Sequence, residues 1–323
     1  FRTFLEKMKQ AFSEKLKLSK ANIERLDTIN SILEDYREDG YVLTLRQLYY
    51  QLVVRDIIPN QQAEYAKLSN ILKKGRMAGI VDRDIIEDRL RQPYLPYWVL
   101  DIDDAINDTI STYRLNRMDG QDKYIEIRVE KDALSWVLKR VSSKYHINLM
   151  VNRGYSSCSA MYDSFRRFSQ HEDCHILYLG DHDPSGLDMV RDIQERLEEF
   201  WVYLTVHHLA ITQEQIATHN PPPNPAKFSD PRADWYVKNY GKTSWEVDAL
   251  PPEVLINTLE AKIRSMIDLK RYSEMLEKES SDKERLQEMI DNWVFWSKFY
   301  LFLLHHGKTT RTPQWVWEGY LNR

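Results

Sequence analysis

Short apolar runs alternate with helical patterns through the middle of this chain. The apolar runs are rich in β-branched and aromatic residues and have the length of strands: residues 123–129, 147–151, 175–179 and 202–208. The segments between them space apolar residues as amphipathic helices do: residues 131–143, 157–170 and 185–199. Strands that alternate with helices predict an α/β unit with a mostly parallel sheet and right-handed crossovers.

Further helical patterns precede this unit. Residues 1–18 mix Lys and Glu with spaced apolar residues, which predicts an amphipathic helix. Ser19 is a suitable N-cap for a second helix, which is expected to end before Gly40. The stripe that this second helix is expected to bury consists of Ile23, Leu26, Ile29, Leu33 and Tyr36.

A third helix is predicted to carry two adjacent tyrosines. Thr44 and Gln47 have the spacing of a capping box, so the helix should begin at Leu45, after a brief strand at 41–43. Its buried stripe is predicted to consist of Leu45, Leu48, Tyr49, Leu52 and Val53. Tyr50 falls outside this stripe, on the side of Arg46, so we expect it to be free to contact a ligand. The alternative is that both tyrosines pack this segment against its neighbour.

A basic helix follows the break at Pro59. Residues 61–77 form a polar helical pattern, and a charged segment follows at 82–91. Helix, turn, helix and short strands over this length predict a winged-helix module. Its candidate DNA-phosphate contacts are Lys67, Lys73, Lys74 and Arg76. The alternative is a solvated helix face with ordinary lysines.

Three carboxylates follow predicted strands. Asp181 and Asp183 come just after the strand at 175–179, and Glu130 just after the strand at 123–129. Clustered carboxylate oxygens suit Mg²⁺ or Mn²⁺ and repel one another without a cation. The sequence therefore predicts a metal site formed by these three residues, although an Asp-x-Asp turn alone also fits simple turn capping. Arg153 lies at another strand-to-helix turn, where it can meet a phosphate.

Three motifs around these residues occur in the order and spacing of a Toprim domain. They are Val129-Glu130-Lys131-Asp132-Ala133, Arg153-Gly154-Tyr155-Ser156-Ser157 and Gly180-Asp181-His182-Asp183-Pro184-Ser185-Gly186. Together they resemble the Toprim domain of the topoisomerase VI A subunit and Spo11 family. Ser244–Leu250 resembles a late segment of the same domain, so the likeness spans about residues 41–250.

The same family carries its nucleophilic tyrosine in a winged helix before the Toprim domain. Residues 46–50 resemble that segment, with Tyr50 at the position of the nucleophile and Gln47 in place of the usual acid. The resemblance implies a Mg²⁺-dependent, type IIB topoisomerase-like transesterase that forms a 5′-phosphotyrosyl link with double-stranded DNA. It also implies a homodimer in which Tyr50 of one subunit acts with the metal site of the other. Arg46 or Lys131 would hold the scissile phosphate.

Two other functions remain open. If water attacks instead of Tyr50, the protein is a hydrolytic Toprim endonuclease of a mobile-element or defence system. A non-catalytic DNA-binding protein is the third possibility. The chain has no G-x-x-x-x-G-K-[ST] phosphate loop, so a full topoisomerase cycle would need a separate ATPase subunit.

Composition limits the partners and the location of the protein. The net charge of the 323 residues is −4, so any DNA contact must come from a local basic patch. The chain has two cysteines without metal spacing, no visible signal peptide and no long apolar stretch. We therefore expect no membrane association and a cytoplasmic protein, nucleoid-associated if it is bacterial or archaeal.

Five segments are therefore expected, in an α/β protein with a Rossmann-like Toprim sheet. They are N-terminal helices (1–40), a winged-helix module (41–92), a linker with one connecting helix (93–122), a Toprim catalytic domain (123–250) and a helical C-terminal segment (251–323).

Overall fold

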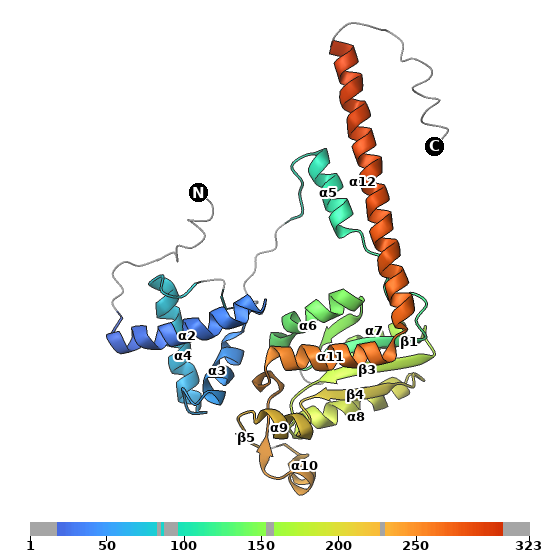
Figure 1. The fold of residues 1–323 in the computed structure, drawn as a ribbon. Coiled ribbons are helices and arrows are strands. Elements are labelled where there is room, and N and C mark those ends of the chain that lie inside the picture. Colours follow the sequence, from blue (N-terminus) through green and yellow to red (C-terminus); the bar gives the residue numbers. More distant parts are fainter. Residues whose placement is uncertain (1–17, 83–84, 87–95, 153–157, 227–229, 306–323) are drawn as a thin grey trace. The chain divides into compact units, whose positions relative to one another are not determined.

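The computed structural model describes residues 18–82, 85–86, 96–152, 158–226 and 230–305. The chain divides into two compact units, one formed by residues 1–93 and 118–268 and the other by residues 94–117 and 269–323 (Figure 1). Helix α11 (Pro252–Met266) thus belongs to the first unit rather than to a separate C-terminal segment beginning at 251. The helix expected at 1–18 lies outside the described residues.

A four-stranded parallel sheet forms the centre of the first unit, in the order β2-β1-β3-β4 (Figure 1). The strands are β1 (Lys123–Val129), β2 (Asn148–Val151), β3 (Asp173–Leu179) and β4 (Thr205–Ala210). The expected α/β class and parallel sheet are confirmed. The last strand begins later than residue 202 because Val202 and Leu204 pack into the core before the chain joins the sheet.

Helices cover both faces of this sheet. On one face, α7 (Cys158–Phe168) and α8 (Pro184–Glu198) pack against alternate residues of β3, including Ile176 and Tyr178. On the other face lie α6 (Asp132–Tyr145) and α11. Because β3 is central and covered on both sides, it is almost continuously apolar, as buried parallel strands are.

Short elements follow β4. They are α9 (Gln213–His219), β5 (Asn224–Pro225), α10 (Ala233–Tyr240), β6 (Thr243–Ser244) and the single-turn helix η2 (Val247–Ala249). The proline-rich run at 221–225 is extended, as expected for consecutive prolines, and its last two residues pair with β6. This pairing leads the chain into η2.

Three helices at the amino-terminal side share one core: α2 (Lys20–Glu38), α3 (Leu45–Val54) and α4 (Gln62–Met77). Ser19 caps α2 and the Thr44–Gln47 capping box begins α3, as predicted. The prediction for Ile23 was wrong: it is exposed at one edge of the stripe, whereas Ile32 at the other edge is buried, so the buried face is rotated toward Ile32. The strand expected at 41–43 is a single bridge between Leu43 and Ile86, and most of the following charged segment lies outside the described residues.

The second unit contains α5 (Ile102–Thr112) and the 37-residue helix α12 (Leu269–His305). The nearly buried carboxylate of Glu279 on α12 binds the backbone N–H of Leu115 at 3.0 Å, Arg117 at 3.1 Å and Lys283 at 3.1 Å. Burial opposes its charge, yet these donors lower the pKa of Glu279 to about 2. One carboxylate therefore holds the segment after α5 against α12.

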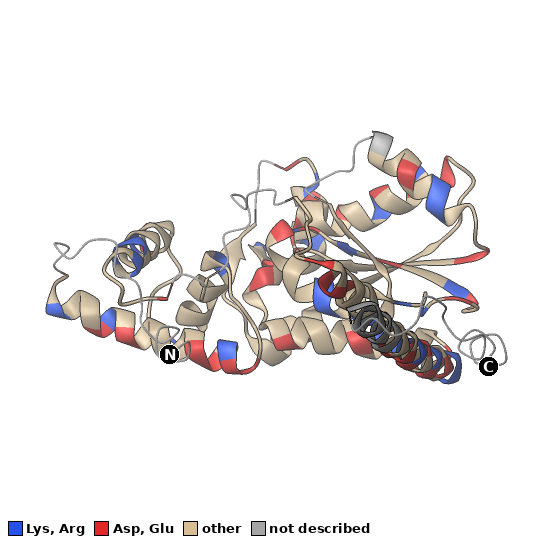
Figure 2. Ribbon diagram, turned by 90° about the horizontal axis from the view of Figure 1, so that it is seen from above, with Lys and Arg blue, Asp and Glu red and all other residues tan. Residues whose placement is uncertain are grey.

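Basic and acidic positions are interspersed along the ribbon (Figure 2). Within the described residues, no helix is both long and apolar enough to cross a membrane.

Glu279→Gln should lower the free energy of unfolding of the second unit by about 3 kcal/mol, since Arg117 and Lys283 lose the anion that they bind. The folded pKa of Glu279 lies below its ordinary value, so the wild-type contribution is complete above about pH 5 and is lost as the pH falls toward about 2. Hydrogen exchange at neutral pH should show faster exchange around residue 115 in the variant.

Glu274→Gln is the matched control, because Glu274 makes only an exposed ion pair with Lys270 on the same helix. Equal exchange in the two variants would contradict the assigned role of Glu279.

Candidate active site

The turn after β3 is fixed by a helix start. Asp183 caps α8, where its Oδ1 accepts hydrogen bonds from Gly186 N at 2.7 Å and Ser185 Oγ at 2.9 Å. A Cβ atom at position 186 would lie 2.1 Å from the backbone oxygen of Asp181, so only glycine permits this close approach. The turn is therefore tightly specified by its own sequence.

Glu130 and Asp181 lie side by side because β1 and β3 are paired neighbours. The Oε2 atom of Glu130 accepts a hydrogen bond from the backbone N–H of Asp181 at 2.8 Å. The Oδ1 atom of Asp181 accepts one from Val247 N, also at 2.8 Å, which joins the sheet edge to η2. The predicted meeting of these two carboxylates at the strand ends is observed.

The ammonium group of Lys131 lies at the centre of the cluster. It is 3.0 Å from Asp181 Oδ1, 2.7 Å from Glu246 Oε2 and 2.8 Å from Asp248 Oδ1. The Asp248 side chain is fully buried. Lys131 directly follows β1, so it reaches three acids from different parts of the unit. We call Lys131, Asp181, Glu246 and Asp248 the charge cluster.

Burial and charge oppose each other within the cluster. Burial raises the pKa of Asp181 to about 7, with Lys131 acting against it. Burial also opposes ionisation of Glu246, but Lys131 and Arg46 lower its pKa to about 2. The pKa of Lys131 is raised, because the three carboxylates outweigh the effect of burial. Lys131 is thus a permanent cation here.

Arg46 and Tyr50 bring α3 to the same cluster. Arg46 forms an ion pair with Glu246 and places Nε 3.3 Å from Asp248 Oδ2. The Tyr50 hydroxyl lies close enough to Arg46 and Glu246 for their charges to act on its pKa. The guanidinium carbon of Arg46 is 5.9 Å from the centre of the Tyr50 ring. Two of the predicted catalytic residues therefore meet the β1 and β3 edge within one unit.

Tyr50, which was expected to be free to contact a ligand, is nearly buried. Its side chain is 3% exposed, because α3 packs on η2 as well as on the helical core and so buries a second face. Burial raises the pKa of Tyr50 to about 12, and Glu246 and Asp248 add to this effect. Tyr50 nevertheless lines a cavity of about 340 Å³ together with Arg46, Tyr49, Asn60 and Glu246, among others.

The observed arrangement does not fit a bound divalent cation. Glu130, Asp181 and Asp183 supply suitable oxygen donors. However, Asp183 is turned into its capping bonds, and Lys131 supplies positive charge beside Asp181. Among the described residues, no group of three or more His, Cys, Asp or Glu side chains is placed to hold a metal ion.

The predicted DNA-contacting residues have different environments. Lys67 is paired with Glu64 at 2.6 Å, and Arg76 donates to the backbone oxygen of Ile86 at 3.0 Å. Lys73 and Lys74 are exposed on α4. Helical spacing of about 100° per residue places Arg76 nearly opposite Lys67, so the four do not form one face. Arg153 lies outside the described residues.

Glu246 and Asp248 were not among the predicted site residues. The available signal was the Ser244–Leu250 segment, with two acids separated by one residue before an apolar pair. No strand was predicted before these acids, and the two-residue strand β6 that precedes them pairs with β5 rather than with the central sheet, so pattern alone did not associate them with the sheet edge. The structure joins them to it through Lys131 and the Asp181–Val247 hydrogen bond.

No protein-family model matches the chain, and no curated protein is significantly similar to it. The case for a function therefore rests on the geometry of the residues described above.

Lys131→Met should destabilise the protein by about 3–5 kcal/mol, because three carboxylates lose their shared cation. For a unit of this size, the melting temperature should fall by about 10 °C. Millimolar Mn²⁺ should restore part of the loss in the variant and leave the wild type nearly unchanged, because Lys131 no longer competes for the acids.

Lys139→Met is the control, since Lys139 is exposed on α6 and away from these acids. A thermal melt in which the two variants behave alike, with or without Mn²⁺, would show that Lys131 does not balance the cluster.

Proposed function

We propose that this protein cleaves DNA strands at the site where α3 meets the carboxyl ends of β1 and β3, with Tyr50 as the nucleophile. The supporting observation is the meeting of Tyr50 and Arg46 with Lys131, Asp181, Glu246 and Asp248. A phenol, two cations and several carboxylates are the groups that phosphodiester transesterification requires. The motif resemblance to topoisomerase VI A and Spo11 supports the same assignment.

Each group has a distinct role in this reaction. The Tyr50 oxygen attacks phosphorus, and the bond to the 3′ oxygen of the neighbouring nucleotide breaks as the 5′-phosphotyrosyl bond forms. The phenolic proton passes to water in the adjacent cavity, because Glu246, with a pKa of about 2, is too weak a base to accept it, and the leaving 3′ oxygen takes up a proton from solvent. Arg46 and Lys131 stabilise the phosphate charge when they exchange carboxylate partners for phosphate oxygens.

The substrate phosphate has a route to Tyr50 through the cavity that this residue lines. Asn60 and Asn224 on the cavity wall add polar groups that can hydrogen-bond to a nucleic-acid backbone. We assign no step to Mg²⁺ or Mn²⁺, because no acids of the described residues are arranged to hold a metal ion and Lys131 already occupies the space between Asp181, Glu246 and Asp248. Metal dependence is instead an outcome of the assay below.

The amino-terminal helices supply the proposed DNA contact. Lys73 and Lys74 are exposed on α4 and can contact DNA phosphates. We propose that the α2–α4 region is a winged helix and that the sheet unit is a Toprim domain. A homodimer and a separate ATPase subunit are proposed on the family resemblance alone.

A second candidate is hydrolytic cleavage, in which water attacks and Tyr50 has a structural role. The observation that favours it is the burial of Tyr50 and its raised pKa of about 12, since a phenol with a high pKa is rarely ionised at neutral pH. The two candidates differ in whether the cut DNA carries covalently attached protein.

Supercoiled plasmid incubated with the protein and Mg²⁺ or Mn²⁺, then denatured, should yield DNA ends linked to protein. Tyr50→Phe should abolish these linked ends, because no phenolic oxygen remains to attack. Tyr49→Phe should retain them: Tyr49 is equally buried next to Tyr50, but its hydroxyl bonds Asn60 at 3.0 Å, away from the cluster.

Free ends produced equally by wild type and Tyr50→Phe would assign the site to hydrolysis. Cleavage that persists in both Asp181→Asn and Glu130→Gln would show that the carboxylates at the sheet edge take no part in the reaction. Repeating the cleavage assay in the presence of a chelator establishes whether a divalent cation is required.

Lys73→Glu combined with Lys74→Glu should weaken DNA binding and reduce the magnitude of its salt slope by about 2, because two phosphate contacts are lost. The matched pair Lys238→Glu with Lys242→Glu changes two exposed lysines, one on α10 and one just before β6, and should bind as wild type does. Fluorescence anisotropy over a salt series measures both slopes. An unchanged slope in the α4 variant would place the DNA surface elsewhere.

A further inference from the structure

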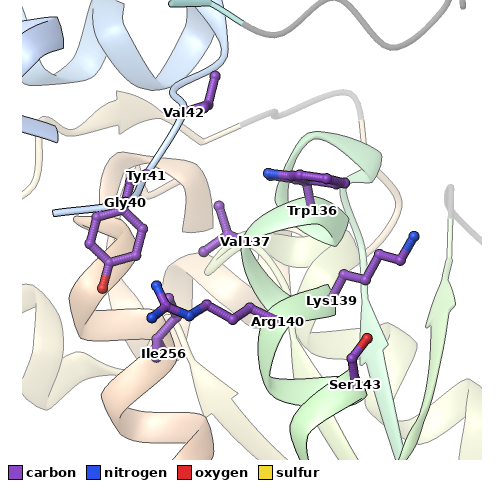
Figure 3. A pocket seen from close by; sticks show the side chains of 9 residues that line it. All are labelled: Gly40, Tyr41, Val42, Trp136, Val137, Lys139, Arg140, Ser143 and Ile256. Atoms are coloured by element: carbon purple, nitrogen blue, oxygen red, sulfur yellow. The ribbon is translucent and has the colours of Figure 1, made fainter. Parts of the chain in front are cut away.

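A second cavity, of about 330 Å³, lies in the first unit and shares no residue with the charge cluster. It is formed where the segment after α2 passes α6 and α11 (Figure 3). Its volume is in the range of small-ligand sites, which begin at about 300 Å³. No step of the proposed cleavage reaction uses it.

The cavity has an apolar base between two aromatic rings. Val137 and Ile256 are nearly buried and form the base. The rings of Tyr41 and Trp136 lie on opposite sides of Val137 (Figure 3). Trp136 is 50% exposed, so its ring is accessible from solvent. An accessible ring beside an apolar base suits a flat aromatic ligand.

The polar groups of the cavity are cationic or neutral. Lys139, Arg140 and Ser143 line it, and none of the lining residues is an acid. This is notable in a chain whose Asp and Glu outnumber Lys and Arg by 49 to 45. Arg140 extends toward Tyr41 and Ile256 (Figure 3), and it makes no ion pair or hydrogen bond with any described residue. Lys139 Nζ is 5.7 Å from the centre of the Trp136 ring.

We propose that this cavity binds a nucleoside phosphate, with the base against Trp136 and the phosphate on the guanidinium group of Arg140. Base stacking on an aromatic ring and phosphate binding by a guanidinium group are the two general means of nucleotide recognition that these residues offer. The ligand is either a free mononucleotide or one nucleotide of a single-stranded segment. This binding does not depend on the proposed cleavage, because it uses none of the same residues.

Calorimetric titration of the full chain with dAMP tests the proposal. Adenosine lacks the phosphate and 2-deoxyribose 5-phosphate lacks the base, so each should bind about tenfold more weakly than dAMP. Trp136→Leu and Arg140→Gln should each weaken dAMP binding about tenfold. The controls are Trp235→Leu, which removes a 55% exposed tryptophan elsewhere, and Arg166→Gln, which removes an exposed arginine of α7.

A single-stranded oligonucleotide with 2-aminopurine at its 5′ end distinguishes the two sources of the ligand. Binding of dAMP that is lost in both cavity variants identifies a free nucleotide. A 2-aminopurine signal that is lost in both variants, without measurable dAMP binding, identifies a nucleotide within a strand. The proposal is overturned if neither ligand distinguishes the cavity variants from their controls, or if 2-deoxyribose 5-phosphate binds as tightly as dAMP.

Discussion

The buried ammonium of Lys131 is the interaction on which the rest of the first unit depends. Three carboxylates from two separate parts of the chain approach it within 3.0 Å, and one of them, Asp248, is fully buried. Such a group of acids is unstable without a cation, since each charge is removed from water and repelled by the others. Lys131 therefore explains why η2 lies against the sheet edge and why α3, through Arg46, lies against η2.

The same arrangement gives the site its chemical character. Arg46 and Tyr50 come from α3, whereas Lys131 and Asp181 come from the ends of β1 and β3, so neither part alone forms the site. Both cations are engaged by carboxylates, and the Tyr50 hydroxyl is buried with a raised pKa. The structure thus describes a closed site, and a phosphate entering through the adjacent cavity would have to replace carboxylates as the partner of Arg46 and Lys131.

Much of this architecture was predictable from the sequence, because local rules control it. Alternating apolar runs predicted the parallel sheet, and the capping box located the start of α3. The carboxylates after β1 and β3 were found because strand ends are recognisable. Helical spacing could not reveal that Tyr50 is buried, since the face it occupies is covered by η2, about 200 residues later in the chain. For the same reason Glu246 and Asp248 were missed, and Lys131 was not expected to be the counterion.

A double-mutant cycle between Lys131 and Asp248 tests the central claim most directly. The free energy of unfolding would be measured for Lys131→Met, Asp248→Asn and the double variant. Each single change leaves charges without their partner, so the two effects should be strongly non-additive, with a coupling of about 3 kcal/mol. Additive effects, with a coupling near zero, would show that the Lys131 ammonium does not hold the acidic cluster together and would contradict this account of the site.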